Sequence, residues 1–154
     1  EFRRRTIFME PYLDLWMLLL EVDLDALAEA PFAEARGLAV DLVLLANDLA
    51  SAERDSKTGA SPDDLNLLHT YARVHAESES ATVERLIAHY NALVERYRAA
   101  TARALAERPG PHAESYVEIL NGVVDGNVAS VRALGSRYPG SEPIMQRLLG
   151  CRTS

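Results

Sequence analysis

Apolar residues recur every three or four positions along most of the chain, which is the period of an amphipathic helix. The pattern predicts helices over residues 11–20, 32–55, 65–71, 80–107 and 112–134. In the second of these, the predicted buried face consists of Leu38, Leu42, Leu45 and Leu49. No run alternates apolar with polar residues as a half-buried strand would. The fold class is therefore predicted to be all-α, a helical bundle.

Residues that interrupt helices lie between these segments. Pro31 suits the first turn of the second helix, where its missing N–H is not needed. Residues 57–62 form a polar loop, residues 108–111 separate the last two long helices, and Gly135 ends the final one. A chain of 154 residues is long enough to bury about 70% of its unfolded surface in one domain.

Composition and charge limit the classes of partner and the cellular location that we expect. The net charge is −7 and the isoelectric point is near 5.1, with no long basic cluster, so nucleic acid is not an expected partner. The longest apolar stretches, residues 15–20 and 38–46, are shorter than the roughly 20 residues that span a bilayer. Cys151 is alone and cannot form an intramolecular disulfide, so we expect a cytoplasmic location. Residues 1–5 resemble neither a signal peptide nor a natural start.

Candidate chemistry begins in residues 47–55. On a helix, residues four apart are neighbours, so the side-chain oxygens of Asn47, Ser51 and Asp55 should rise along one face. Mg²⁺ prefers hard oxygen ligands and often shares them with a substrate phosphate. Arg54 adds a positive charge beside them. The alternative remains open at this point, because Asn, Ser and Asp are also common on a solvated helix face.

This stretch resembles the second metal motif of class I terpene synthases. That motif reads Asn-Asp, an aliphatic residue, any residue, Ser, two of any kind, and usually Lys-Glu. Asn47, Asp48 and Ser51 match it, as does Leu49 at the aliphatic position. Residues 54 and 55, Arg-Asp, are like-charge replacements of the last pair.

The last predicted helix carries a second similarity. In bacterial members of this family it bears a Gly-Asn pair, here Gly126-Asn127, followed by an Arg-Tyr pair that closes over the active-site mouth and hydrogen-bonds the diphosphate. Arg137 and Tyr138 take that place. A guanidinium pairs bidentately with phosphate oxygens, and a phenol adds one more donor. Ser130 stands where the family usually has Trp.

A third similarity lies at the start of the chain. Residues 3–15 resemble the segment that holds the diphosphate-sensing arginine, with Arg4 in that position and Arg5 as the next choice. Phe8 stands where the family commonly has a Gly whose carbonyl points at the reacting carbon. The alternative for residues 3–5 is a solvated or cloning-derived end.

The resemblance implies that residues 1–154 are the C-terminal part of a single terpene synthase domain with the class I α-fold. The aspartate-rich first metal motif is not found, and Asp63 and Asp64, which follow the second motif, are interpreted as loop and capping residues. The implied activity is that of a lyase. It ionises an acyclic prenyl diphosphate with Mg²⁺, three ions in the complete enzyme, cyclises the carbocation to a terpene and releases diphosphate.

The implied site residues fall into overlapping sets. The catalytic residues are Arg4, Arg137 and Tyr138. The diphosphate-binding residues are these three and Arg54, and the metal ligands are Asn47, Ser51 and Asp55. A prenyl diphosphate is the expected small-molecule partner, with no membrane partner. A separate N-terminal half and a homodimer are the partner chains left open. The competing interpretation is a non-catalytic helical remnant or interaction module that lacks the first metal motif. The aromatic residues, Trp16 among them, are interpreted as core or interface residues, and the alternative is an aromatic-lined cavity, which would suit a carbocation.

Overall fold

A computed structural model describes residue 4 and residues 7–22, 30–57 and 66–151. Its elements are α2 (Met9–Leu19), α3 (Ala30–Lys57), α4 (Leu67–His75), α5 (Glu79–Glu107), α6 (Pro111–Ala133), the 3-10 turn η1 (Gly135–Arg137) and α7 (Glu142–Met145). Strands are absent from the residues described, and the predicted all-α class is confirmed. The predicted helix over residues 65–71 is the one whose end differs most, since α4 continues to His75.

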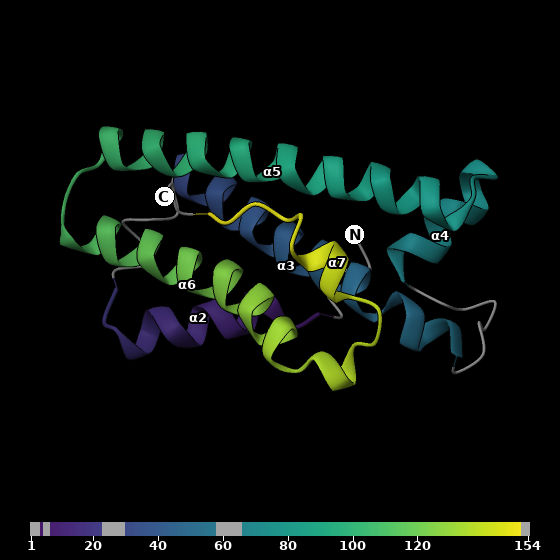
Figure 1. The fold of residues 1–154 in the computed structure, drawn as a ribbon. Coiled ribbons are helices and arrows are strands. Elements are labelled where there is room, and N and C mark those ends of the chain that lie inside the picture. Colours follow the sequence, from purple (N-terminus) through teal and green to yellow (C-terminus); the bar gives the residue numbers. More distant parts are fainter. Residues whose placement is uncertain (1–3, 5–6, 23–29, 58–65, 152–154) are drawn as a thin grey trace.

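Helix α3 is the centre of the bundle and contacts α4, α5, α6 and α7. Figure 1 shows α5 along one side of the bundle and α2, next to α6, along the other. The predicted apolar face of α3 is buried, with at most 5% of each side chain exposed at Leu38, Leu42, Leu45 and Leu49. Because α3 packs against several helices at once, residues 47–55 near its C-terminal end are held in a fixed place.

The turn between α5 and α6 follows from its sequence. Helix α5 begins at the cap Ser78, whose hydroxyl accepts the N–H of Ala81 at 3.3 Å. It ends before Pro109 and Gly110, and Gly110 has φ +149°, a value that L side chains rarely adopt. Pro111 then occupies the first turn of α6, where no intrahelical donor is required.

After α6 the chain returns across α5 and α6, and we call residues 142–151 the C-terminal strap (Figure 1). Side chains of α5 and α6 hold it through its backbone. The contacts are Arg132 Nη2 to the Met145 carbonyl (2.6 Å), the Leu149 N–H to Asn91 Oδ1 (3.0 Å), Arg98 Nη2 to the Gly150 carbonyl (2.8 Å) and the Cys151 N–H to Asp125 Oδ1 (2.8 Å). The strap therefore follows a defined path.

Helix α2 exposes much apolar surface although Leu13 and Met17 are buried. We call this exposed set the α2 apolar surface; it comprises Phe8, Tyr12, Leu15, Trp16, Leu18, Leu19 and Leu20. Contiguous apolar patches on a soluble domain mark sites of interaction or ligand binding. None of the described helices has the length and apolar character to cross a membrane.

Candidate functional site

The predicted oxygen face exists at the C-terminal end of α3. Ser51 is buried, and its hydroxyl donates to Asp55 Oδ2 at 2.7 Å, one turn further on. Asn47 is half-buried one turn before Ser51 on the same face. Asp48 has a different role, because its fully buried carboxylate accepts the N–H of Leu67 at 3.0 Å. It thereby joins the start of α4 to α3.

Asn66 completes this cluster, and sequence reasoning missed it. Its Oδ1 caps α4 by accepting the N–H of Leu68 at 2.9 Å. Its amide nitrogen lies 2.9 Å from the Asp48 carbonyl, 3.2 Å from Ser51 Oγ and 3.1 Å from Asp55 Oδ2. The available signal was an Asn directly before an apolar helical start, which predicts a cap but not contacts with α3.

The environment of Asp55 favours its charged form. Burial alone would raise the pKa of this carboxyl, but hydrogen bonds from Ser51, Asn66 and Arg54, together with the Arg54 charge, lower the pKa below its usual value. Arg54 contributes through Nη2, 2.9 Å from Asp55 Oδ1. Asp55 is therefore ionised at neutral pH and offers a carboxylate beside the Ser51 hydroxyl.

The structure brings the Arg-Tyr pair to the same end of α3. The guanidinium carbon of Arg54 lies 5.4 Å from the ring centre of Tyr138, and that of Arg137 lies 5.8 Å from it. Both distances suit cation–π contacts. The chain just beyond packs closely on α3, because a Cβ on Gly140 would come within 1.9 Å of Glu53 Oε2. Four predicted residues, Arg54, Asp55, Arg137 and Tyr138, therefore gather in one place.

Arg4 lies elsewhere. Its Nε is 2.5 Å from Asp41 Oδ1, and its Nη2 is 2.6 Å from Asp41 Oδ2 and 3.0 Å from the Gly37 carbonyl. Asp41 precedes Asn47 by six residues, about 9 Å along the helix axis. The structure thus does not bring Arg4 to the cluster around Asp55. Arg5, Asp63 and Asp64 lie outside the described residues.

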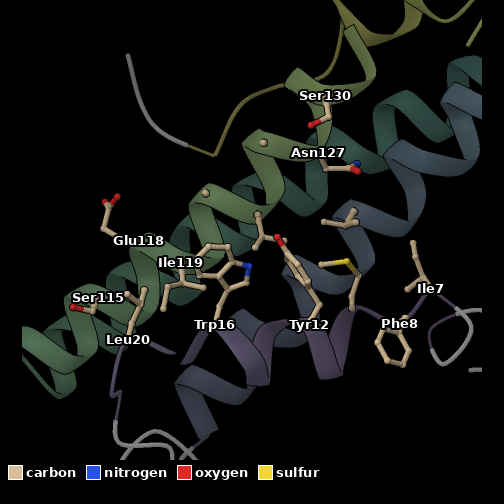
Figure 2. A pocket seen from close by; sticks show the side chains of 15 residues that line it. Ile7, Phe8, Tyr12, Trp16, Leu20, Ser115, Glu118, Ile119, Asn127 and Ser130 are labelled. Atoms are coloured by element: carbon tan, nitrogen blue, oxygen red, sulfur yellow. The ribbon is translucent and has the colours of Figure 1, made fainter. Parts of the chain in front are cut away.

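A cavity of about 830 Å³ lies beside α3, between α2 and α6 (Figure 2). It is lined by Ile7, Phe8, Met9, Tyr12, Trp16, Leu20, Val43, Ser115, Glu118, Ile119, Gly122, Val123, Gly126, Asn127 and Ser130. Tyr12 and Trp16 point from α2 toward α6, and their rings meet edge to face at 6.2 Å. Trp16, whose place in a pocket the sequence left open, is one of the residues that line this cavity. Val43 is one turn before Asn47, so the cavity and the oxygen face share α3.

Phe8 has an unusual backbone for its residue type. It precedes α2 with φ +60° and ψ +20°, the left-handed conformation that glycine adopts most easily. Its side chain is 68% exposed, so burial of the ring does little to offset the strain. This geometry explains in physical terms why a Gly suits the position, and it places the Phe8 ring at the edge of the cavity (Figure 2).

The donor set on α3 fits a hard divalent cation. Asn47, Ser51 and Asp55 present an amide, a hydroxyl and an ionised carboxylate along one face, which are the oxygen types that Mg²⁺ accepts. Within the described ranges, no group of three or more His, Cys, Asp and Glu side chains is arranged to share a metal ion. A metal at this end of α3 would therefore depend on neutral oxygens as well as on Asp55.

A comparison with protein families places the chain in a known family. The family described as terpene synthase family 2, C-terminal metal binding, matches residues 1–119. The chain belongs to this family. Its all-α bundle is thus a terpene synthase C-terminal fold, and membership indicates a terpene synthase-type, lyase-class activity in a metal-binding domain. No curated protein and no solved structure matches the chain.

The terpene synthase match covers the predicted metal ligands but ends before the Arg-Tyr pair. Residues 47–55 lie inside the matched range, whereas Arg137 and Tyr138 lie beyond residue 119. A site role for these two residues rests on the contacts that the Tyr138 ring makes with Arg54 and Arg137 and on the sequence resemblance.

Proposed function

We propose that this chain serves the class I terpene synthase reaction. With Mg²⁺ it ionises an acyclic prenyl diphosphate and steers the allylic cation to a cyclic terpene, and diphosphate leaves. The carrying observation is that the Ser51–Asp55 pair and the Arg54–Tyr138–Arg137 group meet at the end of the helix that also borders an aromatic cavity. Polar groups for the leaving group thus lie on the same scaffold as an apolar space for the hydrocarbon.

The site residues would have different roles when the carbon–oxygen bond of the substrate breaks. Asn47, Ser51 and Asp55 would hold Mg²⁺, which supplies positive charge that neutralises the departing diphosphate. Arg54 and Arg137 donate to phosphate oxygens through their planar forks, and the Tyr138 hydroxyl adds a donor. When the bond breaks, its electron pair stays with the diphosphate, and these donors stabilise the charge that develops there.

We also propose Arg4 as a diphosphate-binding and catalytic residue, on the condition that it gives up part of its ion pair with Asp41. Its guanidinium is already paired with Asp41, and the two side chains are 43% and 35% exposed. To bind a phosphate it must exchange part of that pairing for the new partner. The pair is half exposed, so a phosphate can reach it, but the exchange gives up more than an ordinary exposed ion pair would, because Arg4 binds Asp41 in a bidentate manner and also donates to the Gly37 carbonyl.

The cavity would hold the hydrocarbon part. Tyr12 and Trp16 present aromatic faces, which attract a cation through the ring quadrupole. Tyr138 and the residues around it would close the polar end and exclude water, which protects the cation from early quenching. The bound substrate would therefore have its hydrocarbon chain against apolar side chains and its anionic diphosphate at the polar end of the site.

Diphosphate binding by the isolated chain tests this proposal. We expect pyrophosphate to raise the melting temperature when Mg²⁺ is present and to have little effect when it is chelated. Ser51→Ala should abolish the response, and Asn47→Ala should weaken it. Arg137→Ala removes charged hydrogen bonds and should weaken calorimetric affinity by roughly 10- to 100-fold. Ser56→Ala is the matched control, because Ser56 is exposed and bonds to the Ala52 carbonyl and His69 instead.

The variants separate binding from folding. A Ser51→Ala protein that melts near the wild type without ligand but no longer responds to Mg²⁺ and pyrophosphate supports the metal assignment. An equal response in Ser51→Ala, Ser56→Ala and the wild type removes Ser51 from the site. Unchanged affinity in Arg137→Ala likewise removes Arg137.

A second candidate function is favoured by one observation. The α2 apolar surface includes Leu15, Leu18 and Leu19, which are 52%, 71% and 62% exposed. A non-catalytic helical module would use such a surface to bind a partner chain. We propose that residues 1–154 are the C-terminal part of one synthase domain, so the partner to look for is an N-terminal half carrying an aspartate-rich motif. Intact mass measurement of the isolated sample distinguishes this from a second copy or a chain that stands alone.

A further inference from the structure

Helix α6 faces the cavity with a row of residues that have little or no side chain. Gly122, Gly126 and Ser130 are four residues apart, so they stack along one face of the helix. All three line the cavity, and Figure 2 shows the aromatic rings of Tyr12 and Trp16 on the opposite side, rising from α2. The width of the cavity is thus set on one side by rings and on the other by exposed helix backbone.

The fold itself does not require glycine at these positions. The described glycines with positive φ are Gly110 and Gly140, not Gly122 or Gly126. A Cβ built on Gly122 or Gly126 meets nothing within 4 Å, whereas one on Gly140 would collide with Glu53. Glycine is, apart from proline, the least favourable residue in a helix interior, so alanine at either position should stabilise α6. The glycines keep space open at a cost in stability.

We infer that Gly122 and Gly126 are specificity-determining positions, which admit a long acyclic hydrocarbon chain between α6 and the rings of Tyr12 and Trp16. This inference rests on the proposed function for the identity of the chain as a prenyl group. Ile119 and Val123 extend the same wall with apolar side chains. At the other end of the row Asn127 and Ser130 add polar groups, toward the C-terminal end of α6 and the Arg137–Tyr138 segment that follows it.

Substitution at Gly126 separates this role from a structural one. Gly126→Ala should raise the melting temperature by roughly 2–4 °C, because alanine favours the helix and meets no neighbour. Gly126→Leu places a branched side chain in the cavity and should lower affinity for long ligands by roughly tenfold or more. Ala129→Leu is the size-matched control, since Ala129 is exposed on the same helix and is not among the cavity residues.

The probes are geraniol, farnesol and geranylgeraniol, with binding followed by quenching of Trp16, the chain's single tryptophan. These alcohols lack the diphosphate, so they test the hydrocarbon wall without the metal site. We expect binding to strengthen with chain length in the wild type and in Ala129→Leu. In Gly126→Leu and Gly122→Leu the gain with length should be lost, with folding unchanged by circular dichroism.

Three results would overturn the inference. The first is that the wild type binds none of the alcohols, and the second is that Gly126→Leu and Ala129→Leu bind them equally well. The third is that Gly126→Ala melts at a lower temperature than the wild type. Binding of pyrophosphate with Mg²⁺ is measured separately in the same variants. Loss of that response in every variant and in the wild type would contradict the proposed function, whereas the alcohol series alone decides the role of the glycines.

Discussion

Replacing Asn66 by alanine removes two kinds of hydrogen bond at once. The Oδ1 cap on the Leu68 N–H is lost, and so are the amide donors to Ser51 and Asp55. A lost cap costs about 1 kcal/mol, and loss of the donors to these buried or half-buried acceptors adds about 1–2 kcal/mol. We therefore expect the free energy of unfolding to fall by about 2–3 kcal/mol, which for a domain of this size lowers the melting temperature by roughly 4–12 °C.

Urea unfolding followed by circular dichroism measures this change, and Ser78→Ala supplies the reference. Ser78 caps α5 through one hydrogen bond to Ala81 and has no link to the site. Its loss should cost only about 1 kcal/mol. If Asn66→Ala and Ser78→Ala lower stability equally, the amide of Asn66 does not support Ser51 and Asp55, and the network described for the end of α3 is wrong.

An aspartate at position 66 sharpens the test. Asn66→Asp keeps an oxygen for the Leu68 N–H but puts a second carboxylate about 3 Å from Asp55, as the wild-type amide distance shows. Two carboxylates this close disfavour ionisation of both, so the pKa of the pair's second proton rises. The variant should be nearly as stable as the wild type at acidic pH and lose stability as pH increases toward neutrality. A pH-independent difference would contradict this.

Two further predictions concern single residues. Folding lowers the pKa of Asp55, so the contribution of this carboxylate to stability is present above its unfolded pKa and is lost as pH falls through the folded value. In urea titrations, Asp55→Asn should therefore lose less stability than the wild type as pH falls below about 4. An unchanged dependence of stability on pH would contradict the direction of the pKa shift. Phe8 has a strained left-handed backbone, so Phe8→Gly should raise stability by about 1 kcal/mol. Phe8→Ala keeps the backbone strain and should not raise stability. Equal effects of the two substitutions would contradict the assignment of strain to Phe8.

The sequence predicted the helices well because their signals are local. The heptad-like spacing of Leu38, Leu42 and Leu45 records burial directly, and the Pro and Gly residues around position 110 mark an unavoidable break. The register of Ser51 and Asp55 also follows from helical periodicity alone. These features require no knowledge of what packs against the helix.

Local sequence signals could not predict the contacts between segments that are distant in the sequence. Nothing in the local sequence of Arg4 indicates that Asp41 would take its guanidinium, since that depends on how the N-terminal residues lie along α3. Asn66 is recognisable as a cap, but its distances to Ser51 and Asp55 depend on the angle between α3 and α4. Likewise the open space beside Gly126 becomes visible only when α2 is placed opposite α6.

The C-terminal strap has a consequence for the Arg-Tyr pair. Tyr138 lies on a short span between the end of α6 and a strap that Asn91, Arg98 and Asp125 hold through backbone atoms. A residue on a short span fixed at both ends samples far less volume than one on a free tail, which raises its effective concentration at Arg54. Since these anchors contact main-chain atoms, the exposed side chains of the strap can change while Tyr138 stays within reach of Arg54, whereas Met145, Leu148 and Cys151 are buried in the core.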